Sequence, residues 1–325
     1  MSTDVESGFG LAPERVFASL GHETRLAILF ALWEARDAEA HVQRRGLPFS
    51  ELRKRVGIRD GSQFNYHLKP LLDRFVHHTD DGYVLTREGD HVMSAVLAGS
   101  LTEDVVFEGV PYDEPCPLCG GQVVFEAGTE RTLGWFVVRC TECVGSFGDS
   151  GIEGSLSVTD FLTPAGARNR APDEHFRAAM VRVKHQLLSM IEGVCPACTG
   201  PISATPHVCS DHHVEPGRVC GTCDSVFGSY FLRVCDVCRD DWVVMGDRHL
   251  LTHPTVLASL HEHGYDPWGF AWHRIELDVV RRWTVVSEEP FVLEAELDVG
   301  WDRLVVTLDG EGTVTDVSAV LPADR

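Results

Sequence analysis

The sequence contains very little lysine and no long apolar run. Only three of its 28 basic residues are lysines, and no apolar segment reaches the ~18 residues that a membrane span requires. The first residues lack the basic and then apolar segment of a secretory signal. Phosphate-loop, zinc-protease and serine-hydrolase motifs are also absent. We therefore expect a cytoplasmic protein that is not an enzyme and does not bind membranes.

The composition is that of a globular protein with an unusual charge. The chain has 325 residues, of which 44% are hydrophobic and 24% charged, enough for two or three domains with ordinary cores. Its formal net charge is −21. Because acidic excess with scarce lysine is typical of proteins from a highly saline cytosol, we interpret this charge as a halophilic adaptation rather than as an argument against nucleic acid.

Positive charge is concentrated in one segment. Residues 44–74 contain eight basic and three acidic side chains, a local charge of +5 that leaves −26 for the rest of the chain. A basic segment on an acidic chain is the electrostatic pattern expected of a phosphate-binding face. The basic residues are Arg44, Arg45, Arg53, Lys54, Arg55, Arg59, Lys69 and Arg74.

The first hundred residues predict helices followed by a hairpin. Apolar periodicity indicates helices over 15–20 and 23–36, a third that begins near Pro48 with Ser50 as its cap, and a fourth over 62–75 that Pro70 should kink. A hairpin over 77–86 and a helix over 88–97 follow. This is the order of elements in a winged helix.

The residue pattern over 62–75 predicts a helix with one buried and one exposed face. Its apolar residues recur at helical spacing, and its opposite face carries hydrogen-bonding side chains suited to base edges in a major groove. We predict that this face contacts DNA bases through Ser62, Gln63, Asn65, Tyr66 and Lys69. We predict that phosphates are held by Arg53, Lys54, Arg55 and Arg59.

The segments Phe17–Leu29 and Ser62–Leu71 resemble the winged-helix domain of ArsR-like transcriptional regulators. The resemblance implies a homodimer on double-stranded DNA, with residues 62–75 as recognition helix and the 77–84 hairpin as wing. Founding members of that family sense metal through cysteines in the preceding helix, and residues 50–56 contain none. Metal sensing is therefore not expected here. A winged helix used only for protein contacts is the alternative.

Ten of the 11 cysteines form five Cys-x-x-Cys pairs. In a cytosolic chain such pairs indicate zinc, because two thiolates on one tight turn supply half of a tetrahedral site. Two pairs joined by a hairpin predict a zinc ribbon, with Cys116, Cys119, Cys140 and Cys143 as ligands. Four sulfur ligands leave no position for a catalytic water, so this site should be structural.

The later cysteines are one ligand short of two four-coordinate sites, and His212 is the natural eighth ligand, with His213 or His207 as substitutes. Because residues 224–234 read as a hairpin turning at Gly228, we expect the ligands to pair in line. One zinc would then take Cys195, Cys198, Cys209 and His212, and the other Cys220, Cys223, Cys235 and Cys238. Nested pairing stays open. The ligand order also resembles a RING finger, with crossed pairing, but seven residues between His212 and Cys220 depart from that pattern. We expect three structural zinc ions in total.

The remaining chain predicts a helix over 172–193, a helix over 253–263 and antiparallel strands from Trp283 to Val317 with a turn at Asp309. The apolar face of the first helix packs either on its own zinc cluster or in a dimer seam. We assign five tryptophans to a hydrophobic core, with a small-molecule pocket among them as the alternative. They are Trp242, Trp268, Trp272, Trp283 and Trp301. The whole arrangement resembles haloarchaeal ArsR-like regulators with cysteine-rich C-terminal regions.

These patterns predict an α+β multidomain protein. The expected domains are a winged helix-turn-helix over 1–104, a zinc ribbon over 105–165, a helix with a two-zinc cluster over 166–250, and a small α/β domain with an antiparallel sheet over 251–325. The expected function is a homodimeric DNA-binding transcriptional regulator with a zinc-stabilised region for dimerisation or for an unknown effector. The alternative is a transcription-machinery adapter that resembles the archaeal initiation factor related to the alpha subunit of TFIIE.

Overall fold

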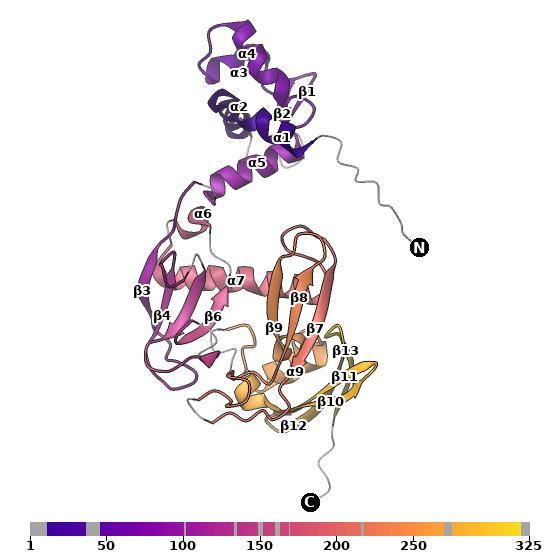
Figure 1. Cartoon of the computed structure of the whole chain (residues 1–325). Coiled ribbons are helices and arrows are strands. Elements are labelled where there is room, and N and C mark those ends of the chain that lie inside the picture. The colour runs from indigo at the N-terminus through magenta and orange to yellow at the C-terminus, as the bar shows by residue number, and fades with distance from the viewer. Residues whose placement is uncertain are drawn as a thin grey trace, which may run out of the picture. The chain divides into compact units, whose positions relative to one another are not determined.

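The computed structural model describes residues 12–36, 46–100, 102–132, 135–148, 152–159, 163–168, 170–215, 218–269 and 275–319. The chain divides into two units, Met1–Glu103 and Asp104–Arg325 (Figure 1). The architecture is mixed α+β, with helices dominating the first unit and antiparallel sheets the second. No helix in the described ranges is long and apolar enough to cross a membrane. Arg44, Arg45 and Trp272 lie outside the described residues.

The first unit is a small helical domain with one hairpin. Its described elements are α1 (Pro13–Leu20), α2 (Glu23–Glu34), α3 (Phe49–Arg55), α4 (Gly61–Leu68), the 3-10 turn η1 (Lys69–Leu71), β1 (Val76–Thr79), β2 (Gly82–Leu85) and α5 (Arg87–Ala98). The helices are held together by apolar side chains that are fully buried, including Ile28, Leu52, Phe64, Leu68 and Met93. The helices and hairpin expected from the periodicity are therefore present, with two differences at helix ends.

The first difference is the length of α4. The helix ends at Leu68 and continues as the single turn η1, where the periodicity predicted a helix to residue 75. Pro70 has no N–H to donate and its ring clashes with the preceding turn, so it ends the helix rather than kinking it. The second difference is the cap of α3, which is Pro48 with no side-chain hydrogen bond. Ser50 lies inside the first turn, and its assignment as cap was wrong.

The hairpin is fixed at one end to the segment before α3 and at the other to the start of α5. β1 and β2 pair antiparallel from Val76 opposite Leu85 to Thr79 opposite Gly82. A Cβ on Gly82 would lie 2.4 Å from the backbone of Leu47, so only glycine allows this approach. At the other end the Thr86 side chain accepts the N–H of Gly89 and caps α5.

The second unit contains three antiparallel sheets in its described residues. The first sheet has the order β3 (Phe107–Tyr112), β4 (Val123–Ala127), β5 (Phe136–Cys140) and β6 (Ser155–Thr159). The second has the order β7 (Ile202–Val208), β8 (Ser229–Cys235) and β9 (Asp241–Met245). The third has the order β10 (Val280–Glu288), β11 (Phe291–Val299), β12 (Asp302–Asp309) and β13 (Val314–Ala319).

A long helix, α7 (Pro172–Ile191), connects the first two sheets and follows the short α6 (Pro164–Ala167) (Figure 1). Its Phe176 and Ala179 are buried in the core of the first sheet beside Phe125. At its other end the Met190 carbonyl accepts a hydrogen bond of 2.9 Å from the buried guanidinium of Arg233 on β8. The helix expected over 172–193 is confirmed, and the face that carries Phe176 packs within the second unit.

The third sheet packs with the second through a shared core. Helices α8 (Gly246–Leu250) and α9 (Pro254–Glu262) and the π-helical turn η3 (Ile275–Val279) join the two sheets, and Phe231, Leu260 and Leu293 lie fully buried among them. The helix and antiparallel strands expected in this region are confirmed. So is the turn at Asp309, whose carboxylate accepts the N–H of Thr313 at 2.8 Å.

Candidate metal centres and nucleic-acid interface

Twelve side chains gather into three groups that can each hold a metal ion. In each group the four ligand atoms lie within 4.8 Å of one another. The groups are Cys116, Cys119, Cys140 and Cys143 (site 1), Cys195, Cys198, Cys235 and Cys238 (site 2), and Cys209, His212, Cys220 and Cys223 (site 3). All twelve ligand candidates predicted from the sequence are therefore brought into sites.

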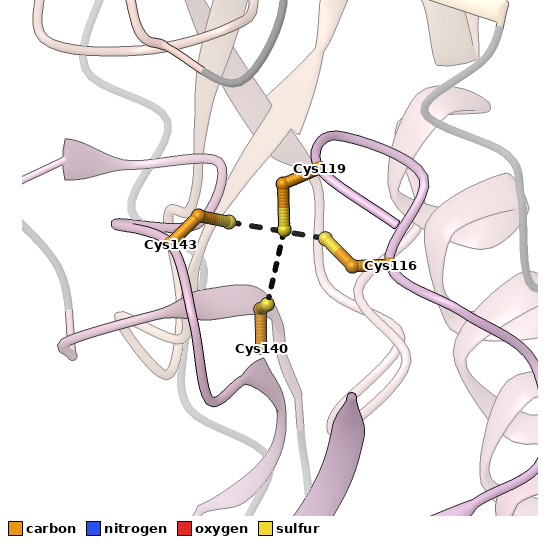
Figure 2. A group of neighbouring side chains, drawn as sticks. All are labelled: Cys116, Cys119, Cys140 and Cys143. Carbon is orange, nitrogen blue, oxygen red and sulfur yellow. Dashed lines mark hydrogen bonds between the residues drawn. The ribbon is translucent and has the colours of Figure 1, made fainter. Parts of the chain in front are cut away.

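Site 1 is built from two tight turns at one end of the first sheet. Figure 2 shows its four sulfur atoms directed at a common centre. The Sγ atoms of Cys116 and Cys143 are 3.8 Å apart, and those of Cys119 and Cys140 are 3.5 Å apart. A metal bound tetrahedrally at about 2.3 Å from four sulfurs would separate them by about 3.8 Å. The site therefore fits a tetrahedral metal, while a disulfide would need about 2.05 Å.

Site 2 repeats the arrangement of site 1. Its first cysteine faces its fourth, with Cys195 and Cys238 sulfurs 3.6 Å apart, and its second faces its third, with Cys198 and Cys235 sulfurs 3.4 Å apart. In both sites the first pair precedes an antiparallel strand pair and the second pair ends it. The two four-sulfur sites are thus two copies of one local structure.

A glycine two residues after the second cysteine is part of this repeated structure. The N–H of Gly121 donates to the Cys119 sulfur, and the N–H of Gly200 donates to the Cys198 sulfur, both at 3.4 Å. A Cβ on either glycine would lie within 2.8 Å of the opposite turn, at Glu142 or Val237. The motif Cys-x-x-Cys-x-Gly carries this signal in the sequence, where we did not single it out.

Site 3 has three sulfurs and one imidazole. The Nδ1 atom of His212 lies 3.5 Å from the Cys223 sulfur. Burial lowers the pKa of His212, which favours the neutral imidazole that metals bind. The alternative ligands are placed elsewhere, since His207 stacks on Tyr230 at 4.6 Å and the His213 side chain is exposed. The structure therefore selects His212.

The ligand pairs of sites 2 and 3 are nested, and the in-line pairing was wrong. β7 and β8 pair in a register that puts Ile202 opposite Cys235 and Val208 opposite Ser229. Cys235 thus returns to the start of β7, beside Cys198, while Cys209 lies at the far end, about 20 Å away at ~3.4 Å per residue. The hairpin expected over 224–234 is absent, because Gly228 instead accepts the N–H of Cys209 across from β7.

Backbone N–H groups favour a thiolate at each of the three sites. At site 1, burial alone would raise the pKa of Cys119, but the N–H of Gly121 helps to lower it. At site 3, burial alone would raise the pKa of Cys220, but N–H groups from His213, Cys223 and Thr222 lower it to about 6. At site 2, N–H groups of Cys238 and Val237 lower the pKa of Cys235 to about 6. Burial and the neighbouring thiols raise the pKa of Cys223 to about 12. A cation is therefore needed before all the thiols of a site ionise together.

The α4 helix presents a continuous polar face. Its apolar Phe64 and Leu68 are fully buried in the first unit. The five residues that the sequence predicted to contact bases, Ser62, Gln63, Asn65, Tyr66 and Lys69, are all exposed. Tyr66 is 69% exposed, so most of its side chain is accessible to a partner.

The four predicted phosphate ligands differ in their surroundings. The Arg53 guanidinium donates to the backbone carbonyls of Ile58 and Arg59, so it braces the turn between α3 and α4. Arg55 lies 2.9 Å from the Glu51 carboxylate on the same helix. Lys54 and Arg59 are exposed, as Arg55 is, and lie at the end of α3 and in the turn before α4.

Two family models match the chain. One, a domain of unknown function named DUF7347, matches residues 13–96. The other, a domain of unknown function named DUF7351, matches residues 113–314, which is more than half of the chain. The chain belongs to the DUF7351 family. The DUF7351 match contains all three candidate metal sites, and the DUF7347 match contains the whole α3–α4 region. No curated protein and no solved structure matches the chain.

Proposed function

We propose that this protein is a DNA-binding transcriptional regulator whose second unit is stabilised by three zinc ions. The observation that carries the proposal is the exposed face that begins with α4, on which Tyr66 and four other hydrogen-bonding side chains are all open to solvent. Such a face suits the edges of bases in a major groove. Nearby, Lys54 and Arg59 are cations available for phosphates.

The order of elements in the first unit supports a winged helix. Two helices, α3 and α4, are joined by a short turn, and the β1–β2 hairpin follows directly. In this arrangement α4 is the recognition helix and the hairpin is the wing that flanks it. The resemblance to ArsR-like regulators adds the expectation of a homodimer on a two-fold symmetric site.

The donor sets of the three metal sites support zinc in a structural role. Sets of four sulfurs, and of three sulfurs with one imidazole, are those of closed tetrahedral zinc sites. Such sites leave no coordination position for a substrate or a water, so the proposal assigns them to folding rather than to catalysis. The two turns and the strand pair of site 1 support the zinc ribbon predicted from the sequence.

Selection of random duplex DNA on the purified full chain in molar potassium chloride tests the proposed function. A specific regulator enriches one near-palindromic sequence. The selected duplex then serves to compare Lys69→Glu, on the α4 face, with Arg182→Glu, an identical charge change on the exposed side of α7.

We expect Lys69→Glu to weaken binding at least tenfold and Arg182→Glu to leave it within twofold, because only the first places a carboxylate against DNA. Equal affinities of the two variants would contradict the assignment of α4 as recognition helix. A folded, metal-loaded chain that enriches no sequence would favour the adapter function instead.

A further inference from the structure

The second unit contains an apolar pocket that none of the candidate metal ligands lines. The pocket has a volume of about 90 Å³ and lies among β6, α7, β9 and the segment around Pro267. Its walls come from all of these elements, so it is enclosed by parts of the chain that are far apart in sequence. This makes it a feature of the folded unit rather than a gap between loops.

The walls of the pocket are aromatic and aliphatic. Trp242 and Trp268 are half-buried on its lining, together with the nearly buried Val183. Two valines that line it, Val158 and Val243, are 38% and 49% exposed. Apolar side chains that line a pocket and also remain accessible are suited to cover an apolar ligand.

One cation lies on this apolar lining. Lys184, one of only three lysines in the chain, places its Nζ 5.0 Å from the centre of the Trp268 ring. The charge of the other basic lining residue, Arg248, is balanced by the buried carboxylate of Asp247 at 2.6 Å. Among the described lining residues there is no Asp or Glu. The pocket is therefore locally positive on a chain whose formal charge is −21.

We propose that this pocket binds a small apolar carboxylate, with the apolar part against the two tryptophans and the carboxylate on Lys184. An apolar cavity of about 150 Å³ accommodates benzene, so a pocket of about 90 Å³ holds a short carbon chain or part of one ring, with the rest of the ligand in its open mouth. Apolar contact provides the affinity and the ammonium selects the anion. This inference concerns ligand binding in the second unit and does not rest on DNA binding.

Equilibrium binding to the full zinc-loaded chain, followed by tryptophan fluorescence and checked by equilibrium dialysis, tests the proposal. The probes are benzoate, its uncharged analogue benzyl alcohol, and acetate, which has the charge without the ring. We expect benzoate to bind with a dissociation constant of about 1 mM or lower, and the two analogues to bind at least threefold more weakly.

Two variants, each with a matched control, locate the site. Lys184→Met removes the charge but keeps the apolar stem, and Arg182→Met makes the same change on the exposed side of α7. Val243→Glu adds a carboxylate on the lining, and Val181→Glu adds one at a similarly exposed position, 54% accessible, outside it. We expect Lys184→Met and Val243→Glu to weaken benzoate binding about threefold to fivefold, and the controls to leave it unchanged.

Each other result overturns the proposal. No saturable binding of benzoate would refute a ligand site of this chemistry. Equal affinity for benzoate and benzyl alcohol, with no effect of Lys184→Met, would show a pocket for neutral apolar molecules. Equal affinity for benzoate and acetate would show an anion site without an apolar component. None of these binding experiments measures DNA binding, so failure of this proposal leaves the proposed function unaffected.

Discussion

The nested pairing of the ligands predicts the metal content of a double variant. Cys198→Ser combined with Cys238→Ser removes two ligands of site 2 and none of site 3. The purified variant should therefore hold two zinc ions per chain instead of three. With in-line pairing the same change would disable both later sites and leave one zinc. Metal analysis by mass spectrometry of the native chain distinguishes these results directly.

The structure also sets the size of the stability loss. Site 2 joins residues that are 43 and 37 positions apart. In the chain-entropy treatment, a cross-link that closes a loop of about 40 residues stabilises the fold by about 4 kcal/mol. For a unit of this size that corresponds to a fall in Tm of about 8 to 16 °C. Both substituted thiols are exposed, so loss of packing adds little.

Chelation provides the control for this prediction. After all metal is removed, parent and double variant should unfold at the same temperature, because the substitution then changes only two exposed side chains. The reasoning would be refuted by a variant that retains three zinc ions. It would also be refuted by one that retains two and still melts with the parent.

The remaining predictions concern the two faces of α4 and a buried carboxyl. Phe64→Ala should lower the unfolding free energy of the first unit by about 3 to 5 kcal/mol in denaturant titration, because Phe64 is fully buried. Tyr66→Ala should change it by less than about 0.5 kcal/mol while weakening DNA binding; loss of stability in both variants would contradict the exposed face. Burial, aided by the charge of Asp247, raises the pKa of Glu276 from 4.5 to about 8. The folded chain therefore retains a proton that the unfolded chain releases, and the unfolding free energy falls as pH rises from about 4.5 to about 8. Glu276→Gln keeps an acceptor for Gly228 and Trp283 and should flatten this pH dependence; an equal slope in parent and variant would show that Glu276 is ionised.

Local periodicity was sufficient to predict the face of α4 but not its end. The buried positions Phe64 and Leu68 and the exposed Tyr66 follow from helical spacing alone, because one side of a short amphipathic helix must be covered. The end of the helix depended on Pro70, which stops a helix or kinks it according to what the next residues pack against. The direction of the Arg53 side chain could not be predicted from the sequence either, because its carbonyl partners lie in the turn that follows.

The spacing of the cysteines predicted their chemistry but not their partners. Cys-x-x-Cys pairs fix two ligands each, and this part of the pattern is local. Which pairs combine depends on the register of β7 against β8, a contact between segments more than 20 residues apart that no local pattern shows. The misread hairpin over 224–234 had the same cause, because Gly228 pairs with Cys209 instead of forming a turn of its own.

The nested pairing explains why a metal is needed at site 3. Between β7 and β8 the chain runs from Cys209 to Gly228 with no helix or strand among its described residues, and a connection of this length is rarely ordered by itself. The corresponding connection between β4 and β5 is shorter and closes with a turn in which Thr129 and Thr132 hydrogen-bond each other. A metal bound by four residues of the long connection can replace the core that the connection lacks. The ordered connection then contacts the segment that follows Cys143 of site 1. The N–H of Val226 donates to the Ser146 carbonyl at 2.9 Å, and the ring of Phe227 lies 5.8 Å from that of Phe147. Removal of the site 3 metal should therefore loosen the contact between the regions of sites 1 and 3, although each four-sulfur site keeps its own ligands.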